Sequence, residues 1–163
     1  MEPPSTSSVS IVDESGKGIN GSPIIRGIEV ALRQQGASNP VVCVLLTTDE
    51  AIQALNAEHR GTDEPTDVLT FPAGDFPHAP LGDIAISVPY ASRQAIARGV
   101  SLDQELAFLA IHGALHLCGL DDEDEDSRVV MVEQMNRAAL EAGLEPDEDW
   151  YSLLHHTAAR SAR

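Results

Sequence analysis

The chain is poor in lysine, in cysteine and in long apolar runs. Its ten basic residues stand against 26 acidic ones, which gives a formal net charge of −16. Such a surface repels polyanions at long range and counts against a general nucleic-acid coat protein, although it is compatible with a local arginine patch. No apolar run approaches the roughly 20 residues that cross a bilayer. The start, MEPPSTSS, does not resemble a signal peptide. We therefore expect a cytoplasmic protein with no membrane partner.

The two cysteines, Cys43 and Cys118, lie far apart and form no CxxC pair. They predict buried free thiols rather than a disulfide framework. The 163 residues fit one domain with a hydrophobic core. We place this domain at 1–145, followed at 146–163 by an acidic and then polar tail that lacks sustained periodicity and is expected to be mobile. The sequence does not determine the oligomeric state.

Four short segments have the patterns of β-strands. Residues 8–16 alternate, with Val9 and Ile11 on one face. The continuous apolar run at 40–47 predicts a buried central strand. Two further strands are expected at 67–71 and 82–88, and the turn-rich sequence between them predicts a hairpin or a short crossing loop.

Helices are expected between these strands and after them. Ser22 is a good N-cap for a helix that ends at Gly36, and Thr47 with Glu50 forms a capping box for a helix through about Glu58. The C-terminal half predicts three more helices, at about 89–99, 101–118 and 127–142. Strands interleaved with helices predict a single small α+β domain, in which one mixed sheet of about four strands packs against several helices.

The stretch HGALHLCGLDDEDED begins at His112 and joins two histidines to six consecutive acidic residues. On a helix, His112 and His116 project from the same face because they are four residues apart. Gly119 suits a helix stop, after which the chain can fold back and bring Asp121 or Asp122 towards the imidazoles. Two histidines and a carboxylate leave a fourth position open for water, as in catalytic zinc sites. The spacing predicts a metal site at the C-terminal end of a central helix, whereas an HxxxH pair by itself is more often structural.

The phrase HGALHLCGLDD closely resembles HGxLHLxGYDH, the signature of the YbeY family of rRNA maturation endoribonucleases, whose three histidines are taken as metal ligands. Two other stretches agree with this family. LNAEHRGTDEPTDVLTFP at 55–72 is similar to its segment of LN, Arg and a PTDVLSFP-like strand, and LGDIAIS at 81–87 is similar to its LGDI strand. The resemblance covers about residues 7–143.

This resemblance implies a metal-dependent endoribonuclease that cleaves single-stranded RNA. It further implies a role in small-subunit rRNA 3′ end processing and ribosome quality control, with rRNA and the small ribosomal subunit as partners, no DNA, and a zinc ion in each chain. His112 and His116 fall on the first two ligands, and Arg60 falls on the arginine expected to line the active cleft. Asp121 falls on the aspartate beside the third ligand.

Two positions depart from the family pattern. Leu120 replaces the usual tyrosine, and Asp122 replaces the third histidine. Aspartate is a legitimate zinc ligand, but its shorter side chain requires a closer backbone approach. Its negative charge should make a bound water less acidic than in a three-histidine site, and its harder oxygen could widen acceptance towards manganese or iron. The predicted metal ligands are therefore His112, His116 and Asp122.

Other residues receive roles by hypothesis. Arg60 could grip the scissile phosphate and stabilise charge in the transition state, although an ion pair with Asp63 or Glu64 is the alternative that its neighbours suggest. Asp121 is a candidate general base, or a partner that orients a ligating histidine. Arg93 could extend a substrate-binding rim.

Two other functions stay open at this point. The first is a ribosome-associated binding factor with a structural metal and little cleavage, which the charge of −16 and the replacement at Asp122 both support. The second is a metallopeptidase, since the spacing is similar to HExxHxxGxxH. That pattern requires a glutamate as general base where this chain has Gly113, so a peptidase is poorly supported. The acidic residues at 123–126 precede a helix start, where negative charge is favourable, and one of them, or Ser127, is expected to cap the helix.

Overall fold

Four strands form one mixed sheet in the computed structural model, which describes residues 8–150. The strands are β1 (Val9–Asp13), β2 (Val42–Thr47), β3 (Val68–Pro72) and β4 (Gly82–Ser87). Their order across the sheet is β1-β2-β4-β3, with β1, β2 and β4 parallel and β3 antiparallel to β4. The connection between β3 and β4 is thus the predicted hairpin.

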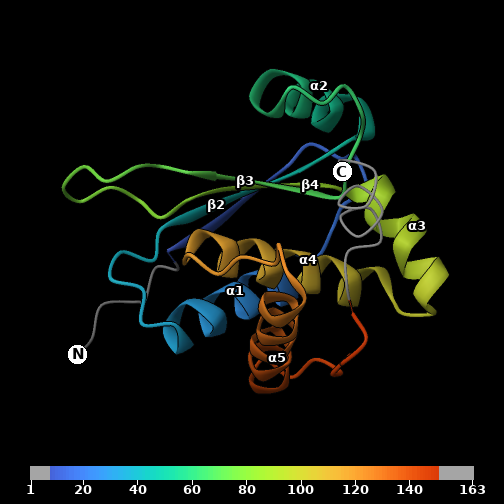
Figure 1. Ribbon diagram of the computed structural model, residues 1–163. Helices are drawn as coiled ribbons and strands as arrows, with labels where there is room; N and C mark the ends of the chain where they lie inside the picture. Colours follow the sequence, from blue (N-terminus) through green and yellow to red (C-terminus); the bar gives the residue numbers. More distant parts are fainter. Residues whose placement is uncertain (1–7, 151–163) are drawn as a thin grey trace, which may run out of the picture.

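Five helices cover this sheet within the described residues (Figure 1). They are α1 (Ser22–Gln34), α2 (Asp49–Arg60), α3 (Val88–Arg98), α4 (Leu102–Leu117) and α5 (Glu125–Glu141). In Figure 1, α2 lies above the sheet, whereas α1 and α4 lie below it with α5 beneath them. The predicted α+β class, with a mixed four-stranded sheet and several helices, is confirmed.

The two faces of the sheet bury different side chains because successive strand residues point in opposite directions. Val44 and Ile84 face the large core shared with α1, α4 and α5. Leu69 and Ala85 face a smaller core under α2, where Ile52 is fully buried. The sheet is therefore a two-sided layer, and the helix of the HxxxH motif lies on its larger core.

Helix α4 is the central element of that core. Twelve of its sixteen residues are buried, which explains why its sequence is apolar around almost the whole circumference. Gly113 lets the helix approach the sheet closely. A Cβ atom there would lie 3.1 Å from Ile84 Cγ2 and 3.3 Å from Thr70 Cγ2. A side chain at Gly113 would therefore require Ile84 and Thr70 to shift by a few tenths of an ångström.

Two predicted helix starts are wrong by one residue. Ser22 is the first residue of α1, and Gly21 occupies the cap position; the Asn20 side chain accepts a hydrogen bond from the Ser22 N–H and takes the place of a serine cap. Thr48, not Thr47, caps α2 with its side-chain oxygen. Thr47 remains in β2 because the strand pairing continues through it.

Other helix limits agree with their sequence signals. Gly99, with φ of 72°, ends α3, and Ser101 caps α4 by accepting a hydrogen bond from the Gln104 N–H. The acidic run caps α5 through Asp124, which accepts from the Ser127 N–H, so α5 begins slightly earlier than predicted and Ser127 lies within it. These local rules need no tertiary contact, which is why they could be predicted.

Three further expectations concern composition and the tail. Cys43 and Cys118 are free thiols, as predicted, but both are only partly buried. None of the helices in residues 8–150 is long and apolar enough to span a bilayer. The segment expected to be a tail from residue 146 begins with a packed stretch, because Trp150 is only 2% exposed. Residues 151–163 lie outside the described residues.

Candidate metal centre

The two histidines of the HxxxH motif lie side by side in the last turns of α4. His112 is fully buried, and the His116 side chain is 22% exposed. Their Nε2 atoms are 3.0 Å apart, and their rings are nearly perpendicular, with an interplanar angle of 86°. Both imidazoles therefore direct the same ring nitrogen towards one point, as the helical spacing predicts.

A tight turn after α4 brings a carboxylate to this point. Gly119 has φ of 99°, a conformation that residues with a Cβ rarely adopt. The Gly119 N–H donates to His116 O and the Leu120 N–H to Leu115 O, which is the Schellman pattern at a helix end. The Leu120 side chain packs against the main core and fixes the turn from within. The chain then reverses, and Asp122 faces the histidines.

Contacts from α5 hold the backbone of this turn. Arg128 Nη1 donates to the carbonyl oxygens of Asp122 and Glu123, at 3.4 and 3.3 Å. The Asp124 carboxylate caps the same helix directly afterwards. The position of Asp122 is therefore fixed from both sides, by the end of α4 and by the start of α5.

The three side chains have donor spacings that suit one small cation. Asp122 Oδ2 lies 3.5 Å from His112 Nε2, and Asp122 Oδ1 lies 3.6 Å from His116 Nε2. A tetrahedral ion with bonds of about 2.0–2.1 Å separates its ligand atoms by roughly 3.3 Å. All candidate ligand atoms of the group lie within 4.8 Å of one another. The donor set and its spacing thus fit a divalent metal.

The site has one closed side and one open side. His112 lies inside the protein, whereas the Asp122 side chain is 15% exposed, similar to His116. Three protein ligands leave one tetrahedral position for water or substrate, which is the arrangement of catalytic rather than structural zinc. The Asp122 carboxylate lies within 3.6 Å of both imidazoles because the turn at Gly119 reverses the chain.

Asp121 is not part of this group of three. It is exposed, and its Oδ1 atom accepts a long hydrogen bond of 3.4 Å from the Glu123 N–H. The turn therefore separates two adjacent aspartates, one facing the histidines and one facing solvent. A role for Asp121 as general base or as partner of a ligating histidine stays a prediction.

Arg60 lies at the C-terminal end of α2 and reaches the edge strand of the sheet. Its Nη2 atom donates to Thr70 O at 3.1 Å. Within the part of the chain that the structure describes, it forms no ion pair with Asp63 or Glu64, the alternative partners. The Thr70 side chain faces Gly113, the neighbour of His112 on α4. The Arg60 guanidinium is therefore hydrogen-bonded to the strand that packs against the metal helix. Its contact with substrate stays a prediction.

Arg93 makes its contacts elsewhere. Its Nη2 atom lies 2.9 Å from Asp49 Oδ2, and its guanidinium lies over the Tyr90 ring, 4.8 Å from the centroid. Both partners belong to α2 and α3, not to α4 or the turn that carries Asp122. The structure does not bring Arg93 together with the three candidate ligands, and its part in substrate binding stays a prediction.

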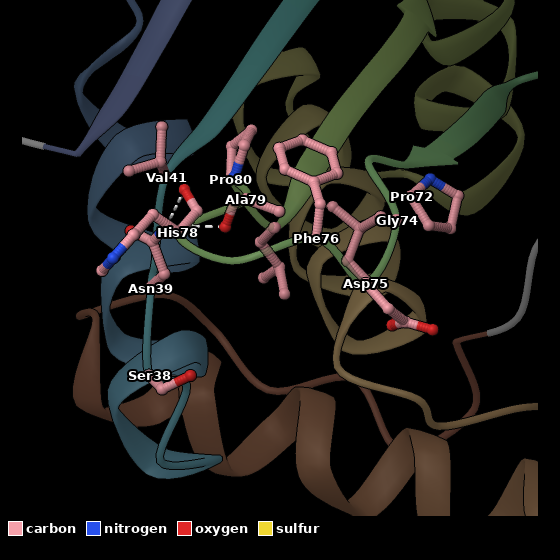
Figure 2. A pocket seen from close by; sticks show the side chains of 12 residues that line it. Ser38, Asn39, Val41, Pro72, Gly74, Asp75, Phe76, His78, Ala79 and Pro80 are labelled. Atoms are coloured by element: carbon pink, nitrogen blue, oxygen red, sulfur yellow. Dashed lines mark hydrogen bonds between the residues drawn. The ribbon is translucent and has the colours of Figure 1, made fainter.

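A groove of about 1070 Å³ is lined by the β3–β4 hairpin and the loop before β2 (Figure 2), together with one residue of α4. Leu117, the residue after His116, is one of the residues that line it. Figure 2 shows Phe76 on the hairpin and Asn39 on the loop before β2; the Asn39 amide donates to the carbonyls of residues 78 and 79 and joins the two loops. Phe76 is 58% exposed. The only acidic residue that lines the groove in the described chain is Asp75, so this surface is less acidic than the net charge suggests.

Sequence reasoning missed two residues near His112. Glu105, two helical turns earlier on the same face of α4, is 1% exposed, and the Trp150 ring lies 5.3 Å from the His112 ring. Glu105 stands directly before the apolar run that starts at Leu106, which was a signal for a buried polar contact. The position of Trp150 had no signal, because the sequence near it has no periodicity and its partners are distant.

The fold and the site define a small single-domain α+β protein with a candidate mononuclear metal centre. Comparison with known proteins gives the family. The model of the family described as endoribonuclease YbeY matches residues 22–143, and the chain belongs to this family. An endoribonuclease YbeY of Synechococcus sp. is 45% identical over 134 residues, covering 74% of this chain and 82% of the relative. The protein of the same name from Shouchella clausii is 42% identical over 130 residues, covering 71% and 78%.

A solved structure supports the fold. The chain is similar to a Thermotoga maritima protein solved in solution, with a TM-score of 0.55 and 28% identity. The match covers 82% of this chain and 88% of that protein. The predicted family membership is confirmed.

Proposed function

We propose that this protein is a metal-dependent endoribonuclease that uses His112, His116 and Asp122 as its metal ligands and acts on single-stranded RNA. The observation that carries the proposal is the convergence of these three side chains on one point, open to solvent on one side, in a member of the endoribonuclease YbeY family. Zinc is the metal we propose, because two imidazoles and one carboxylate in tetrahedral spacing suit it. Manganese or iron would also accept this donor set.

A metal held there would supply Lewis acidity towards a water molecule and a phosphate oxygen. The side chains of the protein would position the metal, bind the phosphate and accept the proton. His112, as a buried ligand, fixes the position of the site. His116 and Asp122 are partly exposed, so a phosphodiester can reach the metal position from the solvent side. Arg60 would give up its hydrogen bond to Thr70 O and donate two N–H groups to the phosphate, where its positive charge would neutralise the negative charge. Asp121, on the solvent side of the turn, would accept a proton from water.

The groove beside Leu117 gives a path for the RNA strand. Phe76 and His78 offer flat side chains on which bases can stack, and stacking of this kind favours unpaired strands. Stacking tolerates an acidic protein better than phosphate contacts do, since it needs few positive charges. We further propose that the substrate is rRNA, processed at the 3′ end in the small ribosomal subunit, with a role in ribosome quality control.

Cleavage of a labelled single-stranded RNA tests the proposed activity. We expect the wild type to cleave it, a chelator to abolish cleavage, and added zinc to restore it. Arg60→Ala should lower kcat by roughly 100-fold or more, the effect of removing one group that stabilises the transition state. Arg33→Ala is the matched control, because Arg33 pairs with Glu141 and has no proposed part in substrate binding. Equal activity of wild type and Arg60→Ala would contradict the role of Arg60.

A ribosome-associated binding factor is the second candidate, and the net charge of −16 together with the carboxylate at Asp122 favours it. In that case the metal only stabilises the fold. The same assay separates the two functions. A wild type that binds metal and the small subunit but leaves RNA intact would support the binding factor and contradict the nuclease.

A further inference from the structure

The C-terminal segment after α5 reaches the metal helix, although residues 144–150 lie beyond the stretch of 22–143 that the family model matches. The segment is anchored at two points before Trp150. The Gln104 side chain donates to Glu145 O at 2.6 Å. The Asn136 amide pairs with the backbone of Asp147, accepting at 2.6 Å and donating at 3.0 Å. These bonds direct the chain towards the buried face of α4, where Trp150 is located.

Trp150 fills the space beside a candidate metal ligand. Its ring centroid lies 5.3 Å from the centroid of His112 and 6.0 Å from that of Phe108. The ring is 2% exposed and His112 is fully buried, so no solvent separates them. Contacts of this kind restrict rotation of an imidazole about its side-chain bonds, since the dense interior leaves few alternative positions.

Two charged residues hold the indole in place. Trp150 Nε1 donates to Glu105 Oε1 at 3.2 Å, and the Arg98 guanidinium lies over the same ring, 5.1 Å from its centroid. Arg98 Nε is 3.3 Å from Glu105 Oε1. Burial raises the pKa of Glu105 to about 7, against the opposing influence of Arg98 and of the bond from Trp150. A buried charged pair of this kind is often no more stabilising than apolar residues of similar volume. In some proteins it instead specifies one arrangement of the packed side chains.

We propose that Trp150 is a positioning residue of the metal site. Its indole, fixed by Glu105 and Arg98, packs against the imidazole of His112 and holds this ring in the orientation that presents Nε2 to Asp122 and His116. The inference rests on the proposed metal site and assigns a role to a segment outside the family match. It places the support of the site on three elements: the end of α3, the first half of α4 and the C-terminal segment.

Metal affinity tests this role apart from activity. We would measure the Co²⁺ affinity of the full chain by calorimetry in the wild type, Trp150→Ala, Trp150→Phe and Leu144→Ala, with folding checked by circular dichroism. Leu144 packs against the core from the same segment, so Leu144→Ala controls for general loss of packing. Trp150→Ala should weaken Co²⁺ binding by roughly 10–100-fold, the usual effect of losing a group that orients a ligand. Trp150→Phe, which keeps a ring, should recover part of it, and Leu144→Ala should bind as the wild type does.

The same residue reports the contact directly, because Trp150 is the single tryptophan of the chain. Co²⁺ bound at His112 should quench its fluorescence in a saturable way, and His112→Ala should abolish the quenching. Unchanged Co²⁺ affinity in folded Trp150→Ala, or binding to the wild type without quenching, would overturn this inference alone. A wild type that binds no Co²⁺ would overturn the proposed function together with it.

Discussion

His112 Nε2 lies 3.5 Å from Asp122 Oδ2, although the chain ends a helix and reverses direction between the two residues. The histidine is placed by helical geometry, and the aspartate is placed by the turn at Gly119. A ligand set of this kind depends on backbone conformation as much as on side-chain chemistry. The consequences can be tested one residue at a time.

Gly119→Ala should impair the metal site without removing a ligand. Alanine at φ of 99° is strained by roughly 1–2 kcal/mol, which the turn can relieve only by moving Asp122. We expect both lower stability in urea unfolding and weaker Zn²⁺ binding in a competition assay. Gly36→Ala is the control, since Gly36 also has positive φ, at 70°, and ends α1. It should lose comparable stability and keep its Zn²⁺ affinity; equal affinities in the two variants would contradict the role of the turn.

Asp122→Asn and Asp121→Asn separate the two adjacent aspartates. Asparagine is neutral and keeps only one, weakly ligating carbonyl oxygen, so Zn²⁺ affinity should fall by more than the roughly 10–100-fold that loss of an outer partner produces. Asp121→Asn should leave the Zn²⁺ affinity unchanged, because Asp121 faces solvent. Isothermal titration at constant pH measures both. A larger effect at Asp121 than at Asp122 would reassign the third ligand.

The buried carboxyl of Glu105 should give the fold a distinct pH dependence. Burial raises its pKa from an ordinary value of 4.5 to about 7. Between these values the folded protein retains a proton that the unfolded chain releases, so the free energy of unfolding falls as pH rises through this window and levels off above it. The fall should be on the order of 3 kcal/mol.

Unfolding by urea at several pH values, with a chelator present, measures this slope. Glu105→Gln should lack the part that Glu105 contributes, whereas Glu58→Gln, at an exposed glutamate on α2, should keep the wild-type profile. An identical slope in wild type and Glu105→Gln would show that the Glu105 carboxyl titrates equally in both states.

Much of the fold and part of the site could be predicted, for a physical reason. The strands, the Ser101 cap of α4, a cap for α5 from the acidic run or Ser127, and the pairing of His112 with His116 all follow from periodicity or from contacts within one turn. The start of α2 differed from the prediction because the adjacent Thr47 and Thr48 are equivalent caps by sequence. The start of α1 differed because Gly21, which has no side chain to bond, takes the cap position. The contact of Trp150 with α4 could not be predicted, because it joins distant segments whose local sequence has no pattern.

The resemblance to the family indicated the third metal ligand, which the spacing of residues after the histidines could not decide. Asp121 and Asp122 were both within reach of the histidines, and only the family pattern favoured Asp122 as the ligand. The structure separates them through the φ of Gly119 and the contacts of Arg128, which are tertiary features. Such contacts between separate elements cannot be predicted from the local pattern of a single sequence.

The metal content of the purified chain tests the central claim most directly. We would measure it by mass spectrometry in a background with His155→Ala and His156→Ala, which removes an adjacent histidine pair able to bind stray metal. We predict an equimolar amount of metal in this parent, and its loss in both His112→Ala and Asp122→Ala. Metal retained in Asp122→Ala would remove Asp122 from the site, and no metal in the parent would contradict the metal-dependent function as a whole.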